Sequence, residues 1–363
     1  MVTFISFIVL LGILIFAHEL GHFLAARAGG VGVLKFSLGF GPKIFGKKIG
    51  ETEYVLSWIP LGGFVKLLGE SGTEELPPED EKRSFYKQPR WKRMLIVLAG
   101  PVFNFLLAVV IFFLVYLNGL PNLLPVIGEL SPDSAAASSG ILKDDAILSI
   151  NDRKISFWDE IKPVIRESGG GDLTIRIRRG GEEKIFTVKP KLSKTKNIFG
   201  EEETTYLIGI SPAGKTVIEK KNPPAALISS VEKTWEISKL TVISVVKMLQ
   251  GVLSPRTLGG PIFIAQVAGN QVREGIVPFV LFMAILSINL GVINLFPVPV
   301  LDGGHIFFYL IEMAARREIP VKIKEWASQI GFVFLLMLML FVIMIDIERL
   351  NIKPVNEVLQ FFK

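Results

Sequence analysis

Four long apolar runs punctuate the chain, at residues 1–26, 94–117, about 275–296 and 330–345. Each approaches the roughly 20 residues that an α-helix needs to cross a bilayer. The first run has no basic leader and no small-residue cleavage site, so we expect it to remain as a span. The pattern predicts a polytopic α-helical membrane protein with about four transmembrane helices.

The polar stretch at 27–93 is rich in lysine and arginine, and the positive-inside rule therefore places it in the cytoplasm. Within it, residues 35–44 and 53–68 gather β-forming side chains around glycines, which predicts a membrane-associated β-hairpin. Such a hairpin either offers an edge to an extended peptide or is an ordinary surface element. Residues 71–80 are polar and contain proline, which is typical of a linker.

Beyond the second run the periodicity changes to short strands separated by charges. Strands are predicted at 125–130, 146–150, 173–178 and 184–188, and one amphipathic helix at 156–167. These elements predict a compact α+β domain over 119–191. The second span separates this domain from the basic loop, so we expect it on the extracytoplasmic side.

Residues 192–274 predict a connector. Its segment 197–224 is partly β-like, 225–252 reads as an amphipathic helix at the membrane interface, and 256–269 reads as a loop punctuated by glycine and proline. The predicted organisation is therefore an N-terminal membrane part (1–118), the domain (119–191), the connector (192–274) and a C-terminal membrane part (275–363). Both termini are then extracytoplasmic.

The amino-acid composition restricts which partners and which metal ligands the chain can use. The chain is 50% hydrophobic with a formal net charge of +6, and its basic residues lie beside the apolar runs, so no nucleic-acid partner is expected. It contains no cysteine, which excludes a disulfide framework and any thiolate metal site. A bound metal must use histidine, aspartate or glutamate, and zinc with nitrogen and oxygen ligands fits best.

The sequence His18-Glu19-Leu20-Gly21-His22 ends the first apolar run. On a helix the two histidines lie one turn apart on the same face, where both can bind one metal ion. Glu19 lies beside them, placed to take a proton from water. Ionisable groups in a membrane segment are expensive without a function, so a zinc site inside the bilayer is the first hypothesis.

A second unusual sequence, NLFPVPVLDGGH, runs from Asn294 to His305 at the end of the third apolar run. Its two prolines must interrupt the helix, which is tolerated at membrane depth only where the backbone faces protein or water. The local sequence alone favours an aspartate that only caps the next helix, but together with the His18–His22 motif Asp302, which follows this break, is interpreted as the third zinc ligand. His305 is either an outer partner of the site or an interfacial residue.

The second run is interrupted by Ala99-Gly100-Pro101 and by Asn104. Small residues and an amide inside a span favour close helix packing, or else line a cavity. Packing is the preferred interpretation for these residues.

Together these motifs resemble the site-2 protease family of intramembrane zinc metalloproteases, of the bacterial RseP and RasP type. The segment VIGELSPDSAAASSGILKDDAILSINDRKI resembles a PDZ domain, and one such unit is evident. The resemblance implies a multi-pass protein of the bacterial cytoplasmic membrane that cleaves single-span membrane proteins. Anti-sigma factors and leftover signal peptides are the substrates that it implies.

The chemistry implied is hydrolysis of a peptide bond within a transmembrane segment, with zinc activating carbonyl and water. Glu19 is expected to act as the base, and Asn294 to contact the substrate or the developing oxyanion. Two alternatives stay open: a metal transporter that uses His18, His22 and Asp302, and a PDZ adaptor with a membrane anchor. The PDZ-like domain is expected to exclude bulky substrates, or else to capture a peptide as a strand near 127–130.

Overall fold

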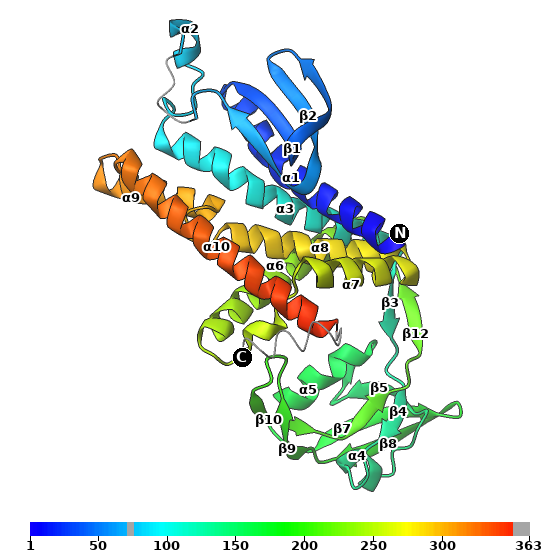
Figure 1. Ribbon diagram of the computed structural model, residues 1–363. Coiled ribbons are helices and arrows are strands. Elements are labelled where there is room, and N and C mark those ends of the chain that lie inside the picture. Colours follow the sequence, from blue (N-terminus) through cyan, green and yellow to red (C-terminus); the bar gives the residue numbers. More distant parts are fainter. Residues whose placement is uncertain (71–75, 351–363) are drawn as a thin grey trace. The chain divides into compact units, whose positions relative to one another are not determined.

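A computed structural model describes residues 1–70 and 76–350. The chain forms two compact units (Figure 1). We call Met1–Phe113, Leu227–Val245 and the chain from Ser254 onward the membrane unit, and Leu114–Ala226 with Val246–Leu253 the inserted unit. Of the predicted linker at 71–80, residues 71–75 lie outside the described part of the chain.

Among the described residues, four helices are long and apolar enough to cross a membrane. They are α1 (Val2–Ala28), α3 (Arg90–Asn118), α8 (Ile276–Asn294) and α10 (Val321–Arg349). The predicted set of about four spans is confirmed. Helix α10 begins nine residues before the apolar run predicted at 330, because its first turns carry lysine and glutamate that a hydropathy pattern leaves out.

Further helices lie wholly or mostly in the membrane unit: α2 (Pro78–Glu81), α6 (Pro223–Leu249), α7 (Pro261–Glu274) and α9 (Asp302–Ala315). The loop predicted at 256–269 is wrong over most of its length, because α7 occupies it. Pro261 stands in the first turn, where its missing N–H costs nothing. The Asp346 carboxylate accepts hydrogen bonds from the N–H groups of Gly260, Ile262 and Phe263, so α10 caps the start of α7.

The hairpin β1 (Val33–Ile49) and β2 (Thr52–Leu67) is longer than the two predicted segments. Strand β2 folds back on itself: Ser37 of β1 pairs with Val55 on one side and with Phe64 on the other. Leu56 of β2 pairs in turn with Leu38 and with Phe45 of β1, so β1 folds back as well. The segment 63–66 is therefore an outer strand, and the first half of β1 lies between it and residues 53–57 of β2. A cluster that includes Phe23, Phe36 and Leu67 packs the hairpin against α1.

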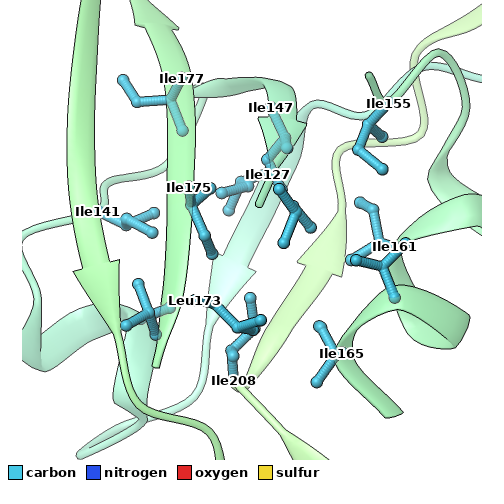
Figure 2. Packing of buried hydrophobic residues seen from close by; sticks show 14 of the residues in the cluster. Ile127, Ile141, Ile147, Ile155, Ile161, Ile165, Leu173, Ile175, Ile177 and Ile208 are labelled. Atoms are coloured by element: carbon cyan, nitrogen blue, oxygen red, sulfur yellow. The ribbon is translucent and has the colours of Figure 1, made fainter. Parts of the chain in front are cut away.

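The inserted unit contains a four-stranded antiparallel sheet in the order β6-β5-β7-β8. Its strands are β5 (Ala146–Ile150), β6 (Arg153–Lys154), β7 (Leu173–Arg179) and β8 (Glu182–Val188), with helices α4 (Ala135–Ser138) and α5 (Ile161–Glu167). Figure 2 shows the isoleucine-rich core, in which Ile147 and Ile175 from the sheet face Ile161 from α5. Apolar residues alternate along β7, as the sequence pattern predicts.

The compact unit extends well beyond the predicted range 119–191. The strands β9 (Lys191–Lys196) and β10 (Glu202–Leu207) form a hairpin, β11 (Ile210–Pro212) pairs with β4 (Ile127–Leu130), and β12 (Thr216–Glu219) pairs with β3 (Leu120–Leu123). The strands of the β11–β4 and β12–β3 pairs are roughly eighty to a hundred residues apart in the chain, and such long-range pairing leaves no local period to detect.

Strand β4 is not a free edge at the place where peptide capture was expected. Its Ile127 pairs with Pro212 of β11 on one side, and the Ile127 N–H donates to the Asp145 carbonyl on the other. A cavity of about 360 Å³ lies instead between α5 and the segment 206–210, lined by residues such as Trp158, Ile165 and Tyr206.

Candidate metal centre

His18 and His22 lie on α1, one helical turn apart. Their Nε2 atoms are 3.2 Å from each other, and the two rings meet edge to face at 87° with centroids 4.8 Å apart. Both side chains are largely buried, with 12% and 14% of their surfaces exposed. Two imidazole nitrogens therefore point at one small volume.

Asp302 reaches the same volume from the start of α9. Its Oδ2 lies 3.1 Å from His18 Nε2, and its Oδ1 lies 3.6 Å from His22 Nε2. Helix α9 can begin here because Gly303 and Gly304 pack directly on the backbone of the segment after α8: a Cβ on Gly303 would collide with Phe296, and one on Gly304 with Val298. The Ser328 hydroxyl of α10 donates to the Pro299 carbonyl of the same segment, at 3.3 Å.

The three side chains fit a zinc ion. Zinc binds imidazole and carboxylate atoms at about 2.0–2.2 Å in tetrahedral geometry, so the ligand atoms of one ion lie roughly 3.3 Å apart. The two Nε2 atoms, 3.2 Å apart, match that spacing, and an Asp302 oxygen lies near each of them, Oδ2 at 3.1 Å from His18 and Oδ1 at 3.6 Å from His22. Three protein ligands leave a fourth position for water or substrate, as catalytic zinc sites require.

Glu19 lies beside the two histidines and is only 8% exposed. It lines a cavity of about 470 Å³ together with His18, His22, Asp302 and residues of β2 such as Gly63 and Phe64. The strand comes so close that a Cβ on Gly63 would lie 3.0 Å from the Glu19 side chain. A carboxylate, a metal-ligand set and a strand edge therefore share one cavity.

Comparison with known proteins agrees with this chemistry. The model of peptidase family M50 matches residues 6–338. The chain belongs to this family. A Campylobacter jejuni protein named as a zinc metalloprotease is 36% identical over 349 residues, which cover 96% of this chain and 94% of that protein. The regulator of sigma-E protease RseP of Salmonella typhimurium is 29% identical, over 95% of this chain and 98% of that protein.

Membership of family M50 makes the chain a zinc-dependent metalloprotease and, with its apolar helices, a multi-pass bacterial membrane protein. The prediction of zinc as the cofactor is confirmed. Which residues hold the zinc stays a prediction, which the geometry above supports.

Two glycines make room for the candidate site of this M50 protein. A Cβ on Gly21 would collide with the backbone of Ala99, so α1 and α3 touch here, as the blue and cyan helices of Figure 1 illustrate. A Cβ on Gly100 would lie closer than 3.0 Å to His22 and 2.9 Å from the Cε1 of His18. Gly100 of the second span thus contacts the histidines themselves, beyond the helix packing expected of it.

Of Asn294 and His305, only His305 lines the cavity beside Glu19. Asn294 is the last residue of α8, is half-buried and is not among the described residues that line the cavity of about 470 Å³. Its catalytic role stays a prediction. His305 does line the cavity, one turn after Asp302, as do Arg93, Tyr309 and Lys324, which no motif had singled out.

Proposed function

We propose that this M50 member hydrolyses peptide bonds within the transmembrane segments of single-span membrane proteins. His18, His22 and Asp302 hold the zinc, and Glu19 is the general base. The observation that carries this assignment is the convergence of the three ligand atoms within 4.8 Å of one another, next to a buried glutamate. Anti-sigma factors and signal-peptide remnants are the substrate classes to test first.

When bound by these residues, zinc would supply Lewis acidity to the scissile carbonyl and lower the pKa of water toward about 7. Glu19 would take a proton from the attacking water and deliver it to the leaving amine. The two imidazoles and the Asp302 carboxylate orient the site. Asn294 donates a hydrogen bond to the substrate or to the developing oxyanion, a contribution of typically about 3 kcal/mol.

The substrate must unwind before attack, because a helix hides its amides in internal hydrogen bonds. The segment 63–66 of β2 offers a binding site for the unwound substrate. It pairs with β1 on one edge only, among the described residues, and Gly63, Phe64 and Val65 line the cavity beside Glu19. An extended substrate segment adds to this free edge as a further strand. Gly39, in the other glycine-containing segment predicted at 35–44, is already approached by a strand, because a Cβ on it would meet backbone of β2.

Assays of substrate cleavage and of bound zinc distinguish the roles of these residues. Glu19→Gln keeps the ligand set but removes the proton acceptor, so the variant should retain zinc and lose cleavage of a single-span substrate. His18→Ala, His22→Ala and Asp302→Ala should each lose zinc. Glu325→Gln on the exposed start of α10 is the matched control and should cleave normally.

Two results would contradict the assignment. Near-stoichiometric zinc in Asp302→Ala would remove that residue from the ligand set, and cleavage by Glu19→Gln at the wild-type rate would remove Glu19 as the base. The metal-transporter alternative requires no base, so transport of zinc by Glu19→Gln without cleavage by the wild type would favour it. The peptidase family match favours the protease.

The inserted unit is proposed to be PDZ-like and to restrict which substrates reach the membrane site. Its sheet and the helices α4 and α5 around one core support this assignment. A membrane-embedded site already holds its substrate by the transmembrane segment, so exclusion of bulky substrates is the proposed role. Peptide capture is the alternative, and the cavity beside α5 is then the place to test.

A further inference from the structure

The two candidate zinc-binding histidines differ in how their second ring nitrogen is held. His22 Nδ1 lies 3.0 Å from the backbone carbonyl of Ile96, to which it can only donate. A neutral imidazole carries one proton. With that proton on Nδ1, the lone pair of His22 Nε2 is free for a metal ion.

His18 faces a side chain instead of a carbonyl. The side-chain amide nitrogen of Asn104, on α3, lies 3.0 Å from His18 Nδ1. Asn104 is fully buried, at 0% exposure, and its amide oxygen has no hydrogen-bond partner among the described residues. A buried amide oxygen without a hydrogen-bond partner costs about 1–3 kcal/mol of folding free energy, so an orientation that gives this oxygen a partner is favoured.

The chemistry of His18 decides which way this amide points. The nitrogen and oxygen of an asparagine amide have nearly the same shape, and a half-turn exchanges them. With the nitrogen toward His18, the ring nitrogen Nδ1 must accept, and the proton moves to Nε2, the atom that faces Asp302. With the oxygen toward His18, Nδ1–H donates to it and Nε2 keeps a free lone pair.

Asn104 is also held rigidly. The buried Ser287 hydroxyl of α8 donates to the Asn104 backbone carbonyl at 2.7 Å, which ties this turn of α3 to a second helix. One turn earlier, Gly100 contacts the histidine rings. The amide is therefore fixed against an imidazole that it can orient.

We propose that Asn104 is a positioning residue for zinc binding: its amide oxygen accepts a hydrogen bond from His18 Nδ1–H and so presents Nε2 to the metal. The proposal rests on the proposed function, in which His18 is a zinc ligand. It assigns to Asn104 the part that the Ile96 carbonyl plays for His22. Outer partners of this kind typically change metal affinity 10- to 100-fold.

The test measures zinc affinity by competition with a chromophoric chelator in detergent, together with thermal unfolding and the visible spectrum of the Co²⁺-loaded protein. Asn104→Leu keeps the approximate volume and removes the acceptor. Asn104→Asp restores an acceptor oxygen. Asn289→Leu is the matched control, because Asn289 is a second amide in a membrane helix, whose oxygen accepts from the Thr241 hydroxyl at 2.7 Å.

We expect Asn104→Leu to bind zinc about 10- to 100-fold more weakly and to alter the Co²⁺ spectrum. Asn104→Asp should recover wild-type affinity, and Asn289→Leu should leave it unchanged. If Asn104→Leu does not fold, Asn104→Ala carries the same expectation, because it removes the acceptor without adding apolar bulk.

Wild-type zinc affinity in Asn104→Leu or Asn104→Ala would overturn the proposal. So would an equal loss in the Asn104 and Asn289 variants, since that would report general damage to helix packing. A failure of the proposed function looks different: His18→Ala would then bind zinc as tightly as the wild type, whatever the Asn104 variants do.

Discussion

The contact of Gly100 with the two histidines predicts that one added methyl group will damage the metal centre. A Cβ at position 100 would lie 2.9 Å from Cε1 of His18 and closer than 3.0 Å to Nε2 and Cε1 of His22, whereas ordinary contacts begin at 3.4 Å. In Gly100→Ala the His18 ring must therefore retreat by about 0.5 Å, and the His22 ring by more, or α1 and α3 must separate.

The free-energy cost can be estimated for both responses, the movement of the histidine rings and the separation of the helices. Overpacking of this kind costs typically about 1–3 kcal/mol. If the rings give way, that free energy appears as roughly 5- to 150-fold weaker zinc binding, because displacements of about 0.5 Å already exceed what a metal site tolerates. If the helices give way, it appears as lower thermal stability with milder loss of zinc.

Chelator competition and thermal unfolding on the same detergent preparation distinguish the two responses. Gly12→Ala is the matched control, since it makes the same substitution in α1 where an added Cβ meets nothing within 4 Å. It should bind zinc normally and, as a helical alanine, be at least as stable. Unchanged zinc affinity and unchanged stability in Gly100→Ala would refute the packing that we describe.

Three further predictions concern other parts of the chain. Burial raises the pKa of Asp145, but hydrogen bonds from Arg179 and from the Leu142 N–H lower it more, so the pKa lies below the usual value. The ionised carboxylate therefore stabilises the inserted unit above about pH 4, and this stabilisation is lost as the pH falls further. Hydrogen exchange in β5 and β7 should become faster over the same pH range. In Asp145→Asn the exchange rates should no longer show this pH dependence. Asp346→Ala should speed exchange at the start of α7 by roughly 5- to 30-fold, because a cap worth about 1–2 kcal/mol disappears, and an unchanged rate would deny the cap. Replacing 120–219 by a short linker should increase cleavage of a full-length substrate and leave a pre-trimmed one unchanged; loss of both in a protein that still binds zinc would favour peptide capture.

Sequence predicts the parts of this protein that local spacing determines. The apolar runs became α1, α3, α8 and α10, and the four-residue spacing of His18 and His22 placed their Nε2 atoms 3.2 Å apart. Asp302 could be added only because its proline-interrupted surroundings are unusual for a span, since nothing in the 279 residues between His22 and Asp302 fixes a distance to α1.

Long-range contacts account for what the sequence does not reveal. The position of Asn104 against His18 depends on how α1 and α3 cross, which the small residues at 99–101 suggest but do not determine. The strands β11 and β12 of the segment 197–224 pair with strands that precede the sheet of the inserted unit, so a local pattern cannot reveal these partners. Pro261 was taken as a helix breaker, although in the first turn it favours a helix.

The pairing of β3 with β12 has a consequence for how such a protein can change over time. Leu120 lies opposite Glu219, so the polypeptide leaves α3 and returns toward α6 through two neighbouring strands. Sequence can be gained, lost or exchanged between these two points while the ends that join the helices stay together. A two-stranded stem of this kind lets one proteolytic core acquire different attachments without being rebuilt.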